Sequence, residues 1–76
     1  MKLLAIPDAS GKTMLWINAE HLVSVGRIEL HDGREVRLIA ELKVEGMPLQ
    51  RIELGAYSSP QEADTPWASF LARLEA

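Results

Sequence analysis

Two histidines, His21 and His31, are the side chains of this sequence best suited to bind a metal ion or to act as a general base. We predict that both lie on one strand, about 30 Å apart, which prevents them from sharing a metal ion within one chain. Asp32 follows His31 and could orient its imidazole, but no serine or lysine is placed as an obvious nucleophile. The sequence therefore predicts no catalytic residue, no metal site and no cofactor. A ligand-binding or catalytic role for the His31-Asp32 turn is the third functional hypothesis.

The segment Ser10-Gly11-Lys12-Thr13 matches the end of a phosphate-binding P-loop. The complete motif needs a glycine five residues before Gly11, where this chain has Ile6, and a helix after the loop. The residues that follow, 14–17, are instead apolar and typical of a strand. We interpret the segment as a hairpin loop and not as a nucleotide site.

Charged residues of both signs alternate through the middle of the chain. They are the acids Glu29, Glu35, Glu41, Glu45 and Glu53 and the bases Arg27, Arg37, Lys43 and Arg51. This mixture predicts a solvated face and not a pair of carboxylates for acid–base catalysis. Arg51 and Glu41 are placed as a cross-strand ion pair, which adds little stability when it is exposed.

The composition limits what these residues can belong to. The chain has 76 residues, 8 Lys and Arg against 11 Asp and Glu, a net charge of −3, 47% hydrophobic residues and no cysteine. We predict a single domain over residues 1–76, stabilised by apolar packing or by association, without disulfides or thiolate-bound zinc. The mild acidity argues against nucleic acid as a partner. Because the apolar runs are too short for a signal peptide or a membrane span, we expect a cytoplasmic protein that binds no membrane.

Five apolar runs predict five strands, at residues 2–6, 13–17, 21–30, 34–44 and 47–56. The connections are too short for parallel crossovers, so the predicted fold class is α+β with a curved, five-stranded antiparallel meander that could close into a barrel. The fourth strand alternates clearly, with its even-numbered residues apolar. In the third strand the apolar residues change from odd-numbered to even-numbered positions at Gly26, and in the fifth they do so at Gln50-Arg51. Each change predicts a β-bulge.

The turn between the third and fourth strands decides which residues are buried. A two-residue Asp-Gly turn would bring charged residues of the fourth strand onto the buried face. A three-residue loop at 31–33 instead pairs Ile28 with Val36 and turns Arg27 and Glu29 toward solvent. Because burying an unpaired charge costs more than an exposed like-charge pair, we predict the three-residue loop.

The last segment predicts a helix over about residues 60–75, packed on one face of the sheet. Ser59-Pro60-Gln61-Glu62 matches a capping box with proline at the first helical position. One helical face then carries Trp67, Phe70, Leu71 and Leu74. Pro66 interrupts the pattern, so the helix either kinks there or restarts there after a short turn.

Residues 16–25, Trp-Ile-Asn-Ala-Glu-His-Leu-Val-Ser-Val, resemble a segment of many small bacterial β-proteins, including flagellar-regulator-like ones. In such segments an apolar strand, an Asn with a polar turn and a β-branched strand follow one another. The resemblance implies a strand–turn–strand unit and assigns no functional residue.

One helix can cover one face of the sheet, which leaves a surplus of apolar residues on the other. These candidate interface residues are Leu15, Trp16, Ile17, Leu22 and Ile39. Either the sheet closes on itself and buries them, or they form a partner surface. The leading hypothesis is a small non-enzymatic interaction module that forms a homo-oligomer or binds another protein. The alternative is a small acidic regulator or inhibitor that binds a basic surface of a larger complex, with salt-sensitive affinity.

Overall fold

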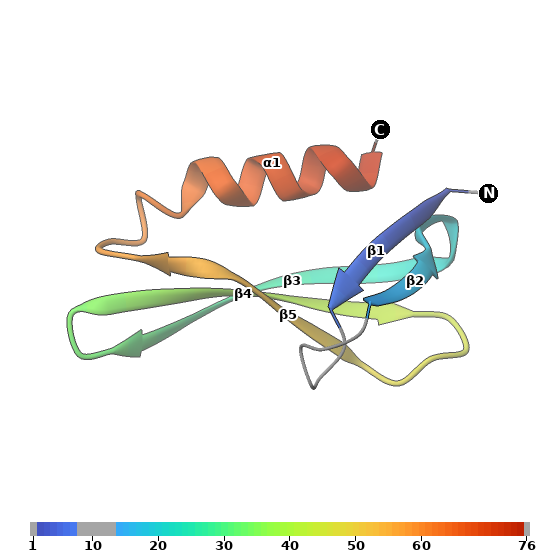
Figure 1. Ribbon diagram of the computed structural model, residues 1–76, viewed down its shortest axis with the longest axis horizontal. Helices are drawn as coiled ribbons and strands as arrows, with labels where there is room; N and C mark the ends of the chain where they lie inside the picture. Colours follow the sequence, from blue (N-terminus) through green and yellow to red (C-terminus); the bar gives the residue numbers. More distant parts are fainter. Residues whose placement is uncertain (1, 8–13, 76) are drawn as a thin grey trace.

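The computed structural model describes residues 2–7 and 14–75, so the loop with Ser10-Gly11-Lys12-Thr13 lies outside the described residues. The described residues form β1 (Leu3–Pro7), β2 (Met14–Asn18), the 3₁₀ turn η1 (Ala19–His21), β3 (Leu22–Asp32), β4 (Glu35–Val44), β5 (Gln50–Tyr57) and α1 (Asp64–Glu75) (Figure 1). All strand pairs are antiparallel. The α+β class is therefore confirmed, with five antiparallel strands and one C-terminal helix in the described part of the chain.

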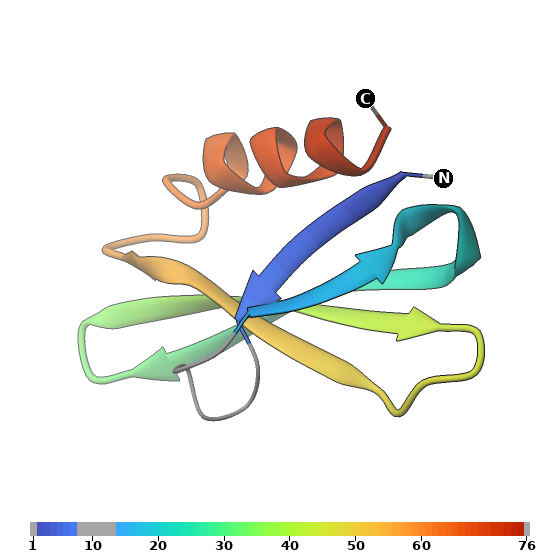
Figure 2. The same cartoon turned by 45° about the vertical axis from the view of Figure 1, so that its right-hand side comes forward.

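The strands divide into two sheets, which corrects the prediction of one continuous meander. β1 and β2 form a two-stranded sheet, and β3, β4 and β5 form a second sheet in that order. Within the described residues neither sheet closes, so the barrel-like alternative is wrong. Figures 1 and 2 show the β1–β2 hairpin and α1 on the same side of the three-stranded sheet.

The turn η1 explains why β2 does not continue into the larger sheet. The Asn18 side chain accepts a hydrogen bond from the Glu20 amide at 3.0 Å. The Ala19 amide donates to the Lys2 carbonyl at 2.7 Å. The second bond extends the β1–β2 pairing by one position, since Leu3 pairs with Asn18. The first redirects the chain between β2 and β3, because the Asn18 side chain satisfies an amide of the turn in place of a strand ladder. His21, which we predicted to begin the third strand, ends this turn instead.

The core lies between the three-stranded sheet and the two elements that cover it. The even-numbered residues of β4, from Val36 to Val44, are all buried, which confirms the alternation predicted for this strand. The main apolar cluster joins three of them to the hairpin and the helix; its buried members are Leu4, Ile6, Ile17, Ala40, Leu42, Val44, Ile52 and Phe70. The hairpin therefore buries one of its two faces against the sheet.

The turn between β3 and β4 consists of two residues, Gly33 and Arg34, so the predicted three-residue loop is wrong. Gly33 has φ +62° at the first central position of the turn, the pattern of a type II′ hairpin turn. The resulting register places Arg27 and Glu29 opposite buried residues of β4. The charges that we expected in solvent therefore face the core side of the sheet.

Both β-bulges lie away from the predicted positions. In β3 the register shifts between Leu22 and Ser24, whereas Gly26 pairs regularly with Glu41. In β5 the shift leaves Leu54 as the extra residue next to Gly55. The parity change at residues 50–51 has a simpler cause, because β5 begins at Gln50 and the preceding apolar residues lie in the connection.

The helix begins at Asp64, and Pro66 lies in its first turn, where a proline removes no intrahelical hydrogen bond. A separate turn over residues 60–63 precedes it. The Ser59 hydroxyl accepts from the Glu62 amide at 3.3 Å, as in the predicted capping box. The Glu62 carboxylate instead accepts from the Ser58 amide and hydroxyl, at 3.1 and 2.6 Å. The chain thus turns first and becomes helical afterwards.

Three of the four residues of the predicted apolar helix face pack on the core, and the fourth, Leu71, is partly exposed and lies outside that cluster. Phe70 is buried, and Trp67 and Leu74 pack against the same cluster. At the other end of the helix the Lys2 ammonium donates to the Leu74 carbonyl. A cation at a helix C-terminus is favourable, because the last carbonyl groups lack intrahelical partners. This contact joins the beginning of the described chain to its end.

Candidate functional site

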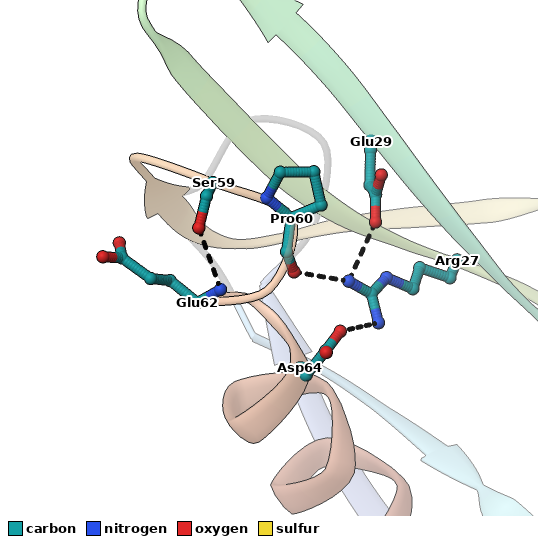
Figure 3. Close-up of polar contacts among 6 residues, drawn as sticks. All are labelled: Arg27, Glu29, Ser59, Pro60, Glu62 and Asp64. Carbon is teal, nitrogen blue, oxygen red and sulfur yellow. Dashed lines mark hydrogen bonds and ion pairs between the residues drawn. The ribbon is translucent and has the colours of Figure 1, made fainter.

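The Arg27 guanidinium joins β3 to the beginning of α1 (Figure 3). Its Nη1 lies 2.9 Å from Asp64 Oδ1, and its Nη2 lies 2.8 Å from Glu29 Oε1. The same Nη2 donates to the Pro60 carbonyl at 3.0 Å. We call Arg27, Glu29, Pro60 and Asp64 the Arg27 cluster. It connects segments more than thirty positions apart in the sequence.

The local structure explains how each group reaches this cluster. Arg27 and Glu29 are two residues apart on one strand, so their side chains point to the same face. Asp64 is the first residue of α1, where a carboxylate complements the positive end of the helix. The Arg27 side chain is 24% exposed and that of Asp64 is 65% exposed. The cluster therefore lies at the rim of the core.

The guanidinium also lies over the ring of Trp67 on the helix. Arg27 Cζ lies 6.0 Å from the ring centroid of Trp67, at the outer limit of a cation–π contact. The Trp67 ring lies 5.9 Å from that of Phe70, with the planes tilted by 35°. Arg27 thus has polar partners at its tip and the Trp67 ring beside it.

One atom of the cluster is not satisfied. Arg27 Nε is buried and has no hydrogen-bond partner among the described residues. An unsatisfied buried donor costs about 1–3 kcal/mol, which the three contacts of the Nη atoms offset. Arginine suits this position better than lysine, because its fork of donors can contact several acceptors at once.

The cluster connects the three-stranded sheet to the helix. The two carboxylates and the carbonyl all contact the guanidinium, so the polar groups of the cluster are paired with one another. Across residues 2–7 and 14–75, no three His, Asp or Glu side chains are grouped so that they could hold a metal ion. In the same part of the chain, α1 is too short to cross a bilayer.

Sequence reasoning missed this cluster for a definable reason. We assumed that charges on the core side would lack partners, but Asp64 and Pro60 supply them from a distant segment. Two signals were available in the sequence. Arg27 and Glu29 have the spacing of a same-face pair, and Gly33 can be the first central residue of a type II′ turn.

Two ion pairs lie on the outer face of the three-stranded sheet, the face away from the helix. Arg51 Nε lies 3.0 Å from Glu41 Oε2, so this predicted pair is confirmed. Arg37 contacts both carboxylate oxygens of Glu53, at 2.8 and 3.1 Å, and its hydrogen bonds lower the pKa of that carboxyl. The second pair escaped prediction because it depends on the register shift at Leu54.

The five candidate interface residues occupy different parts of the molecule. Ile17 is 1% exposed and belongs to the core, so it cannot contact a partner in the folded chain. Leu15 and Leu22 are partly buried against the core. Ile39 lies on the outer face of the three-stranded sheet, opposite Ile28. Trp16 is the one member of this set with a large exposed side chain.

Trp16 has apolar neighbours on the outer face of the β1–β2 hairpin. Trp16 pairs with Ala5. Leu3 lies two residues before Ala5 and Met14 lies two residues before Trp16, so both share this face. The side chains of Leu3, Met14 and Trp16 are each more than half exposed. We call Leu3, Ala5, Met14 and Trp16 the hairpin outer face. The sequence indicated a two-sided second strand, but only the pairing with β1 shows which of its residues are covered.

Comparisons with protein-family models, with curated proteins and with solved structures find no match to this chain.

Proposed function

We propose that this chain is a non-enzymatic protein-interaction module that binds a protein partner through the hairpin outer face. The observation that carries the proposal is the exposure of three large apolar side chains on one face of one hairpin. Contiguous apolar surface of this kind is typical of interaction sites. Trp16 is the expected anchor, because tryptophan is enriched among the residues that contribute most to binding.

The exposed part of Trp16 alone offers a substantial binding energy. It is 62% exposed, which corresponds to an apolar area on the order of 150 Å². Covering that area would contribute up to about 4 kcal/mol before the costs of association. Leu3 and Met14 extend the surface on either side.

Two other surfaces have weaker support. On the outer face of the larger sheet, Ile28 and Ile39 are partly covered, and Arg37–Glu53 and Glu41–Arg51 lie on the same face. The acidic-regulator hypothesis stays a prediction. Four carboxylates that it could use, Glu29, Glu41, Glu53 and Asp64, already contact arginines of the same chain. Such pairing leaves less negative charge to attract a basic partner.

The test compares Trp16→Ala with Val23→Ala. Both side chains are 62% exposed, but Val23 lies at the start of β3 and not on the hairpin outer face. We expect tagged wild-type protein and Val23→Ala to retain the same partner from an extract of the native host, and Trp16→Ala to lose it. Circular dichroism confirms that both variants fold. Equal retention by the two variants would refute the proposal.

A further inference from the structure

β3 has an open edge that lacks most of the usual protections, and its two inward-facing charges, Arg27 and Glu29, contact each other. Among the described residues its backbone pairs on one side with β4, and its eleven residues make it the longest strand. Proteins protect edge strands with proline, lysine, bulges or short length. β1 and β2 have five residues each, and the pairing of β5 carries a register shift. β3 contains no proline or lysine, and its one irregularity lies at its beginning.

The regular part of this edge has opposite charges on either side of its middle residue. After the shift between Leu22 and Ser24, the pairing runs without interruption from Ser24 to Asp32. Ile28 is the middle residue of that stretch. Arg27 and Glu29, of opposite charge, flank it on either side. A strand with this pattern is complementary to an antiparallel copy of itself.

We infer that a second copy of this chain pairs with β3 along its open edge, with a two-fold axis at Ile28. Arg27 then lies opposite Glu29 of the partner subunit, and Glu29 lies opposite Arg27 of the partner subunit. Opposite charges on directly opposed residues stabilise an antiparallel pair. Here they add to the contact that Arg27 and Glu29 already make within each chain at 2.8 Å, so charges of opposite sign alternate across the axis. The two three-stranded sheets join into one continuous sheet of six strands.

Neighbouring registers are less favourable. A two-fold axis at Arg27 would oppose two arginines, and one at Glu29 would oppose two glutamates. Both would also leave part of the regular stretch without a partner. The register with the longest regular pairing is therefore also the one with matched charges. Because one register gives both the longest pairing and matched charges, we favour a second copy of this chain over an unrelated strand as the partner of this edge.

The backbone and the outer face agree with the same register. The residues that flank a two-residue hairpin turn exchange both hydrogen bonds, and the pairs alternate from there. Counting back from Asp32, the odd-numbered residues, Arg27 and Glu29 included, direct their N–H and C=O groups to the open edge. Ile28 then forms the closer, non-hydrogen-bonded pair with Ile28 of the partner subunit. Because Ile28 lies opposite Ile39, four isoleucines would cross the outer face in one row.

This dimer uses a surface separate from the hairpin outer face, so its success or failure is independent of the proposed function. The first test measures the molar mass by sedimentation equilibrium over a range of concentrations. His31→Pro removes a backbone N–H that points to the open edge, and His31→Ala keeps it. We expect His31→Pro to raise the dimer dissociation constant at least about tenfold relative to His31→Ala, since the two-fold axis removes this hydrogen bond once from each subunit.

The second test locates the axis by cysteine cross-linking, which is unambiguous because the chain has no cysteine. In the Ile28→Cys variant the two thiols face each other within disulfide reach. In the Leu30→Cys variant they lie about 13 Å apart, four strand positions from each other. Leu30 is the more exposed of the two side chains, so random collisions would favour its cross-linking.

We expect rapid oxidation of Ile28→Cys to a covalent dimer and at least about tenfold slower oxidation of Leu30→Cys, because disulfides require this close geometry. A monomer at all concentrations up to the millimolar range would overturn the inference. Equal cross-linking of the two variants would overturn it as well. A dimer that Trp16→Ala dissociates and His31→Pro does not would assign self-association to the hairpin outer face instead.

Discussion

Replacing Arg27 by methionine should test whether the Arg27 cluster holds the helix on the sheet. Methionine keeps an apolar stem beside Trp67 but removes the contacts with Glu29, Asp64 and the Pro60 carbonyl. Each of these contacts contributes about 0.5–1.5 kcal/mol, and the exposed Asp64 pair belongs at the low end. The change also removes the buried, unpartnered Nε, which returns about 1 kcal/mol. We expect a net loss of about 2 kcal/mol in the free energy of unfolding, from these terms together.

Urea denaturation followed by circular dichroism measures this loss. In a domain of this size, about 2 kcal/mol corresponds to a fall in melting temperature of roughly 8–16 °C. Arg51→Met is the matched control, because it removes an arginine that pairs with one glutamate on the exposed outer face. We expect Arg51→Met to cost less than about 1 kcal/mol. If Arg27→Met cost no more than Arg51→Met, the cluster would not hold the helix as we describe.

Two further predictions concern a glycine of β5 and the turn before the helix. Gly55 has φ +145°, and a Cβ there would lie 2.7 Å from the Tyr57 hydroxyl oxygen, so Gly55→Ala should cost about 1–3 kcal/mol in urea denaturation. Gly26→Ala should cost nothing, since its Cβ would meet only ordinary contacts at 3.7 Å and beyond, and equal costs would contradict this account. Hydrogen bonds from Ser58 lower the pKa of Glu62. The stability that these hydrogen bonds supply is therefore present above the ordinary pKa of the carboxyl and is lost as pH falls through the lowered pKa. An NMR titration should show a higher Glu62 pKa in Ser58→Ala; an unchanged pKa would show that other groups lower it.

Elements with their own local signal could be predicted from the sequence. The alternation of β4 identified its buried face, and the spacing of Trp67, Phe70 and Leu74 identified the face of the helix that packs. The Glu41–Arg51 pair followed from adjacent strands of known parity. Each of these features depends on residues close in sequence or on one strand pairing.

Features that depend on distant partners could not be predicted in the same way. The register of β3 depends on the length of the turn between β3 and β4, and the residues there are compatible with more than one length. We predicted the three-residue loop because we assumed that Arg27 would find no partner on the core side. Asp64 and Pro60 supply that partner from the start of the helix. The division into two sheets depends on the turn η1, where the Asn18 side chain accepts from the Glu20 amide in place of strand pairing.

The candidate interface shows the same limit. The sequence identified strand two as apolar on both sides, and Trp16 is exposed as an interface residue must be. Ile17 was assigned to the same set although its face packs on the larger sheet. Periodicity shows that two faces exist, but which face is covered depends on where the hairpin is placed by the rest of the chain.

The most direct test of the proposed interaction surface is photo-cross-linking in cells of the native host. A photoreactive phenylalanine analogue replaces Met14 on the hairpin outer face in one variant and Leu49 in the other. Both side chains are large, apolar and just over half exposed, and Leu49 lies in the connection before β5. We predict a cross-linked protein partner from position 14 and none from position 49. The same partner from both positions, or from position 49 alone, would contradict the assignment of the hairpin outer face as the binding surface.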